Sequence, residues 1–514
     1  MKSFKEKLVV IFVFAVILLI GLKYCNDKNG YHLDEVYTYV LSNSEYAPWI
    51  VDIKGGNVIN TVISRQELKD ALTVNENDRF SFGSVYYNQT QDVHPPLYYF
   101  FVHTISSIFT GTFSKWIGLG LNYFLFVATL FLLYEVVSKY FGGHRNANFI
   151  VLVYGLSNIA LSTLMFIRMY MLLTFFTLLL AYYILKIIEN DKKCYVAIAI
   201  TIFLGMITQY YFVIYAFFVC LSCVIYLLIK KRYKQVISFS VSALLGVAFM
   251  VAFFPHFVTQ LSLQESVSMD RTVQNVYNVQ KWWTRFLTMG QDVGPDMIVA
   301  IMFMVVLSAI YLVKVKQHRI DQESLKKLVI IIPAYISYIV VCIIAPYVTD
   351  RYVYHLIPVM ILFLGFLTYN SDERLKRKGL YYIGLFAVTI ISIYGLRKNE
   401  PNYVYDHSVY NMIIEDNAKY PCVFVSENEH APITSAIPQL LYFDECMVVN
   451  EKELENITDY INKGNENKGV ALFVSSLPTN IDRDLVFEKM HELGYQYNDQ
   501  IYEDRFFSMY LFYL

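Results

Sequence analysis

Two adjacent carboxylates, Asp34 and Glu35, lie just after the first apolar run, within the aromatic segment 31–39. Neighbouring residues on a helix point about 100° apart, so these acids cannot act as a pair that shares one proton. One of them can face a reaction centre while the other supports the fold. A carboxylate suits a general base, which accepts a hydroxyl proton or holds a cation. The alternative interpretation is an acid that complements the dipole at a helix N-terminus.

A second polar cluster opens with Asp92 and His94, in the run D-V-H-P-P-L-Y-Y that ends at Tyr99. Two consecutive prolines suit the start of a helix, where a missing backbone N–H costs nothing. His94 would then lie at the positive end of that helix, where an anionic ligand such as a phosphate binds favourably. An interfacial aromatic anchor is the alternative for this run, and a packing role is the alternative for His103 in the same helix.

Two arginines, Arg168 and Arg351, lie between apolar runs with almost no connecting loop, and a tyrosine follows each closely (Tyr170 and Tyr352). An arginine at that depth needs a counter-anion, which a lipid, a ligand or the protein itself can supply. Asp350 is one such candidate for Arg351. The alternative for both arginines is a side chain that extends to the lipid headgroups.

Carboxylates and histidines bind divalent metals, and Asp34, Glu35, Asp92 and His94 could gather in the fold. Their spacing specifies no metal site, so the sequence predicts no metal ligands and requires no cofactor. A divalent metal stays an open alternative.

The composition indicates which kind of fold must position these residues. The chain has 514 residues, of which 56% are hydrophobic and 17% charged, with a mean hydropathy of +0.41. A soluble protein of this length would be about 25% charged and about 45–50% apolar. These values exclude a disordered protein, a disulfide scaffold and an ordinary soluble enzyme. No basic domain stands out, so nucleic acid is not an expected partner.

The apolar runs predict an α-helical polytopic membrane protein. A spanning helix needs about 20 apolar residues, since nothing in lipid satisfies its backbone from outside. The first run follows a basic N-terminus without a small-residue cleavage site, so we expect an uncleaved anchor. Eleven runs are expected to span: 8–25, 116–138, 148–166, 169–188, 194–210, 211–229, 236–254, 296–314, 328–346, 353–369 and 380–396.

A further apolar run, 95–110, is short, and whether it crosses decides the sidedness of everything after it. If it does not cross and the N-terminus is cytoplasmic, the inner connections hold 21 Lys and Arg and the short outer ones hold five. The positive-inside rule therefore predicts a juxtamembrane helix on the outer face. We expect a plasma-membrane protein in which the first loop (26–115) and the tail (397–514) are both extracytoplasmic.

The tail alternates buried strand-like runs with helices, which predicts a small α/β domain. Its last run, 506–514, has the pattern of an edge strand. The expected division is a transmembrane domain over 1–396 and an extracytoplasmic domain over 397–514. The expected elements are strands at 422–426, 446–449 and 469–474 and helices at 433–443, 452–463 and 482–493.

The predicted spans are poor in ionisable residues. An ion-coupled transporter needs such groups near the midplane, so their scarcity favours chemistry at the outer rim. Two alternatives stay open: a polytopic transporter or lipid flippase, which predicts midplane charges or paired broken helices, and a non-catalytic surface module whose tail binds a partner. Six spans contain no Asp, Glu, Lys, Arg or His: 148–166, 194–210, 211–229, 236–254, 328–346 and 380–396.

In combination, these motifs resemble the GT-C glycosyltransferases, and within them family 39, the group of the protein O-mannosyltransferases and aminoarabinose transferases. The resemblance covers about residues 1–400 and rests on D-E, H-P-P-L-Y-Y about sixty residues later, then R-M-Y and R-Y in the expected order. It implies a GT-C-type transmembrane catalytic domain of about 11 helices with outer juxtamembrane helices. It also implies that a sugar moves from a polyprenyl phosphate to a hydroxyl acceptor (a protein, a glycolipid or a cell-wall glycan) on the outer face.

The resemblance further implies roles for individual residues. Asp34 would be the general base of an inverting reaction, and Glu35 a second catalytic acid. Relatives carry an acid and an alanine before the R-M-Y arginine, where this chain has Phe166 and Ile167, which argues against a second acid or a metal there. The implied substrate-binding residues are Asp92, His94, Tyr99, His103, Arg168, Tyr170, Arg351 and Tyr352.

Overall fold

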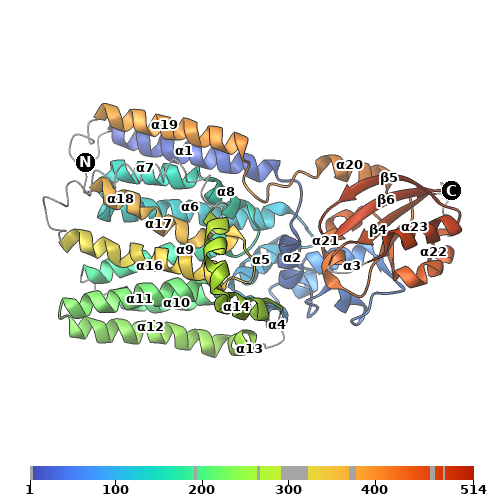
Figure 1. Ribbon diagram of the computed structural model, residues 1–514, viewed down its shortest axis with the longest axis horizontal. Helices are drawn as coiled ribbons and strands as arrows, with labels where there is room; N and C mark the ends of the chain where they lie inside the picture. Colours follow the sequence, from blue (N-terminus) through green and yellow to red (C-terminus); the bar gives the residue numbers. More distant parts are fainter. Residues whose placement is uncertain are drawn as a thin grey trace. The chain divides into compact units, whose positions relative to one another are not determined.

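The chain forms two compact units, each built from two separate stretches of sequence. The helical unit comprises Met1–Asn26 and Leu119–Asn402, and the sheet-bearing unit comprises Asp27–Gly118 and Tyr403–Leu514. Figure 1 shows the helices of the first unit and the strands of the second. The computed structural model describes residues 4–189, 194–262, 267–290, 322–369, 378–462, 469–477 and 481–514.

The apolar runs of the helical unit form helices, because each backbone polar group in lipid must bond within its own segment. The described residues contain six helices that are long and apolar enough to cross a membrane, or seven if one bent pair counts as a span. The pair, α7 (Gly143–Gly155) and α8 (Asn158–Met165), bends by 59° at its break. The six are α1 (Phe4–Asp27), α6 (Lys115–Tyr140), α9 (Tyr170–Ile188), α11 (Phe212–Ile229), α12 (Tyr233–Phe253) and α16 (Gln322–Ile344).

The polytopic helical fold is confirmed, with fewer long helices in the described residues than the eleven predicted spans. The run 194–210 forms a short helix, and 353–369 is divided into one 3₁₀ turn and two short α-helices, the first of which has a proline at its start. The run 296–314 lies outside the described residues. The remaining helical elements are α10 (Tyr195–Met206), α13 (His256–Ser262), α14 (Val267–Tyr277), η4 (Asp350–Tyr352), η5 (Tyr354–Leu356), α17 (Ile357–Met360), α18 (Leu362–Tyr369) and α19 (Lys378–Lys398).

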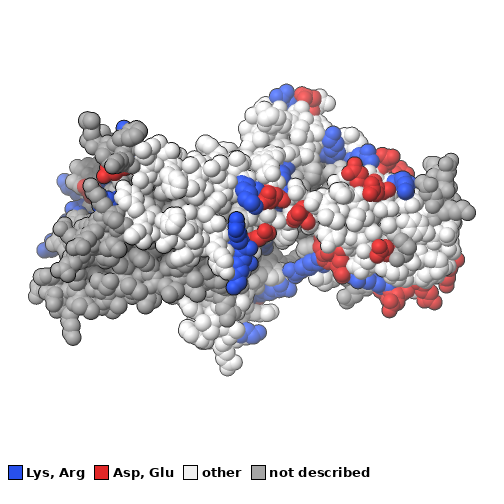
Figure 2. All heavy atoms as spheres, turned by 90° about the horizontal axis from the view of Figure 1, so that it is seen from above, with Lys and Arg blue, Asp and Glu red and all other residues white. Residues whose placement is uncertain are grey.

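Helix α9 has a central position in the helical unit, where it packs against α10, α11, α16 and η5. Figure 2 shows long stretches of the described surface of this unit without Lys, Arg, Asp or Glu. An uncharged helix surface is what a lipid environment requires, because a charge in the hydrocarbon region costs several kcal/mol.

The sheet-bearing unit combines helices from the first loop with a sheet built mainly from the tail. The loop contributes α2 (Leu33–Asn43), η1 (Ile50–Lys54), β1 (Thr61–Ser64), α3 (Arg65–Leu72), η2 (Glu76–Asp78), α4 (Phe82–Gln91) and α5 (Leu97–Ile108). The tail contributes α20 (Ser408–Asn417), β2 (Cys422–Val425), α21 (His430–Leu440), β3 (Glu445–Val449), η7 (Glu451–Ile457), α22 (Thr458–Asn462), β4 (Gly469–Ser475), α23 (Arg483–Glu492), β5 (Gln496–Glu503) and β6 (Phe507–Tyr513).

The six strands form one mixed sheet in the order β1-β3-β2-β4-β6-β5. Strands β3, β2 and β4 are parallel, and the other pairings are antiparallel. The predicted α/β tail is confirmed in its buried strands. The prediction that 506–514 is an edge strand is wrong, because β6 pairs with both β4 and β5. The true edge strand, β5, reads Q-Y-N-D-Q-I-Y-E, which is too polar for a hydrophobicity pattern to reveal.

Strand β1 comes from the first loop and forms the opposite edge of the sheet, antiparallel to β3. Loop helices α2 and α3 contact α21, which also contacts β6. The predicted division at residue 397 lacks this contribution of the first loop, since a four-residue strand carries little periodicity of its own.

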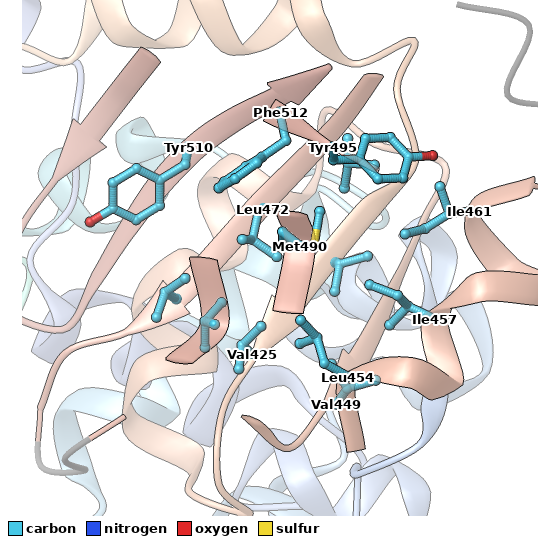
Figure 3. Close-up of a cluster of buried hydrophobic side chains, with 14 of the residues drawn as sticks. Val425, Val449, Leu454, Ile457, Ile461, Leu472, Met490, Tyr495, Tyr510 and Phe512 are labelled. Carbon is cyan, nitrogen blue, oxygen red and sulfur yellow. The ribbon is translucent and has the colours of Figure 1, made fainter. Parts of the chain in front are cut away.

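One face of the sheet buries a cluster of apolar side chains against η7, α22 and α23 (Figure 3). Val425, Leu472 and Phe512 come from three neighbouring strands of this cluster, and Leu454 and Met490 cover them from helices. All five are fully buried, so this face supplies one hydrophobic core of the unit.

We expect Leu472→Ala to destabilise the sheet-bearing unit by about 2–5 kcal/mol, because it leaves a cavity in a close-packed core. Hydrogen exchange of the β4 amides in the full-length protein would measure the loss. The matched control is Leu477→Ala, at a side chain that is 41% exposed, where we expect less than about 0.5 kcal/mol. Equal exchange rates in the two variants would contradict this account of the core.

Candidate active site

Helix α2 begins at the adjacent acids with a reciprocal cap. The His32 Nδ1 atom accepts a hydrogen bond from the Asp34 backbone N–H at 3.1 Å, and the Glu35 carboxylate accepts one from the His32 N–H at 2.8 Å. This capping box satisfies two N–H groups that the helix cannot pair internally. It fixes the direction in which α2 presents both acids.

Glu35 is held in a fully buried ion pair. Its Oε2 atom lies 2.9 Å from the Lys28 Nζ atom, and both side chains are 0% exposed. The Lys28 ammonium also donates a hydrogen bond to the Tyr403 carbonyl oxygen at 2.5 Å. These contacts favour a structural role for Glu35, whereas a catalytic role for it stays a prediction.

Asp34 has a different environment from its neighbour. Its carboxylate is 24% exposed, and its Oδ2 atom lies 3.7 Å from His32 Nδ1. The helical rotation of about 100° between consecutive residues accounts for one acid facing inward and the other outward. Of the two carboxylates, Asp34 is the one that a substrate can reach.

The start of α5 holds a second acid–histidine pair. The His94 Nδ1 atom lies 2.9 Å from the Asp92 Oδ2 atom, and the two side chains are 19% and 12% exposed. The predicted proline start is confirmed, since Pro96 is the N-cap of α5. His94 therefore lies just before the positive end of that helix, paired with a carboxylate.

Two other predicted residues of α5 lie in the interior of the sheet-bearing unit. Tyr99 is fully buried, and His103 is 1% exposed with its Nδ1–H donating a hydrogen bond to the Ser42 carbonyl oxygen of α2 at 2.8 Å. Burial lowers the pKa of His103. The contacts of His103 favour the packing role, and substrate binding by either residue stays a prediction.

An aromatic cluster that the sequence did not indicate lies beside these groups. The Tyr37 hydroxyl, one turn after Asp34 on α2, lies 2.6 Å from the His430 Nδ1 atom, and the His430 ring stacks on Trp49 at 4.5 Å. Burial lowers the pKa of His430, while nearby carboxylates including Asp92 oppose that shift. His430 lies in the tail, where no motif singled it out, so only the folded unit reveals it.

In the helical unit, the junction that holds Arg168 is anchored by an amide. Asn122 on α6 donates hydrogen bonds from its Nδ2 atom to the carbonyl oxygens of Leu164, at 3.1 Å, and Phe166, at 2.7 Å. The Arg168 side chain is buried, and the Phe166 and Tyr170 rings stack at 5.6 Å. Asn122 is a positioning residue that motif reasoning missed, because it lies inside a span.

The second predicted arginine meets the same junction. The Arg351 guanidinium lies 5.4 Å from the centre of the Phe166 ring, and the Tyr352 ring packs on Tyr211 at 4.9 Å. The structure thus brings the Arg168 and Arg351 segments together within the helical unit. The positive charges of Arg351 and Arg285 act electrostatically on Tyr211, a proximity that sequence spacing does not indicate.

Asp350, a candidate counter-ion of Arg351, accepts hydrogen bonds from two other side chains. Its Oδ2 atom accepts hydrogen bonds from the Tyr354 hydroxyl at 2.6 Å and from the Asn402 side-chain amide at 3.1 Å. Burial raises the pKa of Asp350, while the Tyr354 hydroxyl opposes the shift. These bonds tie the Asp350–Tyr352 turn to the last residue of the helical unit.

The predicted site residues therefore assemble into two groups, each within its own unit. Asp34, Glu35, Asp92, His94, Tyr99 and His103 belong to the sheet-bearing unit; Arg168, Tyr170, Arg351 and Tyr352 belong to the helical unit. In the part of the chain that the structure describes, no group of three or more His, Cys, Asp or Glu residues is arranged to hold a metal ion.

A family model of known proteins matches a stretch of the chain that includes parts of both units. Residues 93–258 match the family model of the dolichyl-phosphate-mannose-protein mannosyltransferases, a stretch that includes His94, Tyr99, His103, Arg168 and Tyr170. No curated protein sequence matches the chain.

Two solved structures share the fold. The crystal structure of ArnT from Cupriavidus metallidurans bound to undecaprenyl phosphate has a TM-score of 0.55 and 11% identity, with 98% of this chain and 97% of that chain covered. The apo state of the same protein has a TM-score of 0.51 and 10% identity, with the same coverage. The predicted GT-C-type fold is confirmed.

We expect Lys28→Met to destabilise the protein by about 3–5 kcal/mol, because it leaves the Glu35 carboxylate buried without its counter-ion. The double variant Lys28→Met/Glu35→Leu should lose less stability than Lys28→Met, since it buries no unpaired charge. The melting temperature of the full-length protein would measure both. Lys69→Met, at an exposed lysine of α3, is the control; a Lys28→Met variant as stable as this control would show that the pair does not support α2.

Proposed function

We propose that the chain is a membrane glycosyltransferase of the GT-C superfamily, family 39 type, and that it transfers a sugar from a polyprenyl phosphate to a hydroxyl group of an acceptor. The observation that carries this proposal is the fold that the chain shares, over nearly its full length, with a protein crystallised with undecaprenyl phosphate. The acceptor is a protein, a glycolipid or a cell-wall glycan.

Asp34 is the proposed general base. The acceptor hydroxyl attacks the anomeric carbon of the donor sugar, its proton passes to the Asp34 carboxylate, and the bond from the anomeric carbon to the phosphate oxygen breaks. Polyprenyl phosphate leaves, and the configuration at the anomeric carbon inverts. The partial exposure of Asp34 at the start of α2 supports this role, because a base must come within hydrogen-bonding reach of its proton.

Glu35 is proposed as a positioning residue. Its bonds to Lys28 and to the His32 N–H hold the first turn of α2, and so they hold the direction of Asp34. A constraint of this kind matters because a small displacement of a reacting group lowers the rate strongly.

Arg168 and Arg351 are the proposed ligands of the donor phosphate. Their meeting at the Phe166 junction supports this role, because two guanidinium groups stabilise the charge that develops on a leaving phosphate. Tyr170 stacks on Phe166, and the Tyr352 ring lies 5.8 Å from the Arg351 guanidinium. His94, paired with Asp92 at the start of α5, is a further proposed contact to the phosphate.

The proposed orientation has a cytoplasmic N-terminus, with the sheet-bearing unit and the reaction outside the plasma membrane. The excess of Lys and Arg in alternate connections supports it. On this side, the phosphate of the donor lies at the membrane surface while its polyprenyl chain stays in the lipid.

We expect Asp34→Asn to lower transfer about 10²- to 10⁴-fold, because the amide cannot accept the hydroxyl proton. The measurement is sugar transfer from a polyprenyl-phosphate donor in proteoliposomes that contain the full-length protein. Asp416→Asn, at an exposed position of α20, should retain wild-type transfer. Full transfer by Asp34→Asn would refute the base assignment. If the protein moved lipid across the membrane without a sugar donor, and Asp34→Asn did not reduce this flux, a flippase would be favoured.

Removal of one guanidinium should weaken donor binding. We expect Arg351→Gln and Arg168→Gln each to reduce undecaprenyl-phosphate binding about tenfold or more, since a hydrogen bond to a charged group contributes about 1.5–3 kcal/mol. Thermophoresis of the purified protein with undecaprenyl phosphate measures this. Arg397→Gln, an exposed position at the end of α19, is the control. Unchanged affinity in both site variants would exclude the arginines from the phosphate site.

A further inference from the structure

A pocket of about 280 Å³ lies within the sheet-bearing unit, and none of the residues that line it is a predicted site residue. Its wall combines residues 29–31 and Phe113 of the first loop with His407, Asn411 and residues around Gln439 of the tail. All of these belong to one unit, so the pocket is complete within it. The volume lies just below the range for drug-sized ligand sites, about 300–1,000 Å³, so the pocket suits a small ligand.

Two polar atoms of the pocket wall are buried without a hydrogen-bond partner in the described part of the chain. They are the Oε1 atom of Gln439, whose side chain is 4% exposed, and the Nδ1 atom of His407. Buried polar groups are almost always paired, because an unpaired one loses its bonds to water without compensation. Both atoms come from residues that line the same pocket, so its wall has hydrogen-bonding capacity that the described part of the chain does not use.

The backbone around the pocket is shaped to admit the His407 ring. A Cβ atom at Gly30 would lie 2.6 Å from His407 Nδ1, closer than real Cβ atoms approach a neighbour. Only a glycine therefore leaves room for the imidazole in this position. Gly30 connects the end of α1 to the segment that leads into α2.

The chemistry of the wall fits a neutral, hydroxyl-rich ligand. The described residues that line the pocket include no Lys, Arg, Asp or Glu, and they offer the side-chain amides of Asn29, Asn411 and Gln439. Burial, together with the positive charge of Lys28, lowers the pKa of His407. The imidazole is then uncharged at neutral pH, with one donor and one acceptor nitrogen.

Aromatic rings complete the wall. The Tyr31 and Phe113 rings stack at 4.9 Å, and both residues line the pocket. Amides that bond to hydroxyl groups, combined with flat apolar rings that pack on C–H faces, match the two kinds of surface on a sugar ring. None of the residues that line the pocket is a lysine or an arginine, so the wall itself has no fixed positive charge to pair with a phosphate.

We propose that this pocket binds one neutral sugar ring of the acceptor, which makes the acceptor a glycan or a glycolipid. The inference rests on the proposed glycosyl transfer, and it adds an acceptor subsite to it. Tyr31 precedes Asp34 by only three residues, so a ring held here is anchored at the start of the segment that carries the proposed base.

Binding is tested by saturation-transfer NMR on the full-length protein in nanodiscs, with the methyl glycosides of glucose, galactose, mannose and N-acetylglucosamine as probes. At least one probe should bind the wild type, and Gln439→Met should weaken that binding about tenfold through loss of its amide. Gly30→Ala should weaken probe binding similarly by displacing His407. This second variant keeps the test valid if Gln439→Met fails to fold. Gln66→Met, on the exposed surface of α3, should bind like the wild type.

Three results would overturn the proposal. They are the absence of binding by any probe, equal binding in Gln439→Met and Gln66→Met, and binding of the sugar 1-phosphates in preference to the methyl glycosides.

A kinetic measurement separates this proposal from the proposed function and identifies the source of the ring. If the ring belongs to the acceptor, Gln439→Met should raise the acceptor KM about tenfold, and the loss should fall on KM rather than on kcat. A rise in the donor KM instead would overturn the acceptor assignment. Glycoside binding without transfer from any polyprenyl-phosphate sugar would refute the proposed function while supporting the pocket. Transfer that is intact and insensitive to Gln439→Met would refute only the pocket.

Discussion

The buried ion pair between Lys28 and Glu35 connects the parts of the sheet-bearing unit. The Lys28 ammonium bonds to Glu35 in α2 and to the Tyr403 carbonyl at the start of the tail, while its own carbonyl accepts a hydrogen bond from Lys115 at the end of the first loop. Three segments far apart in sequence thus meet at one residue. Both charges are fully buried, so moving either side chain away from the other would leave an unpaired buried charge. The ion pair therefore links the position of α2 to that of the tail.

The same connection accounts for the arrangement of the polar groups. With α2 tied at its first turn, Asp34 is left partly exposed, and Tyr37 meets His430 of the tail. The segment before α2 lines the pocket opposite Gln439, and Gly30 gives the His407 ring its space. A proposed base and a proposed sugar subsite therefore belong to one rigidly bonded region, although the residues that form it come from both ends of the chain.

The hydrophobic pattern of the sequence predicts the elements that are buried on both faces, and it fails to predict the edge strands of the sheet. Strands β2 and β4 are continuous apolar runs covered on both faces, and both were predicted within one residue. Strands β1 and β5 are edges, and their residues alternate weakly or are polar, so pairing rather than sequence defines them. In the helical unit, apolarity predicted helices correctly, but the apolar run 194–210 is helical only over Tyr195–Met206 in α10.

The sequence by itself determined the class of the protein, the apolar helices, the buried strands and the residue types at the predicted site. Each of these follows from local composition, because lipid and a buried core select apolar residues whatever their partners. Only the tertiary structure decided which of two adjacent acids is exposed, that His103 bonds to the α2 backbone, and that Gln439 and His407 share a cavity. These properties depend on contacts between side chains and segments that local patterns do not connect, some of them several hundred residues apart.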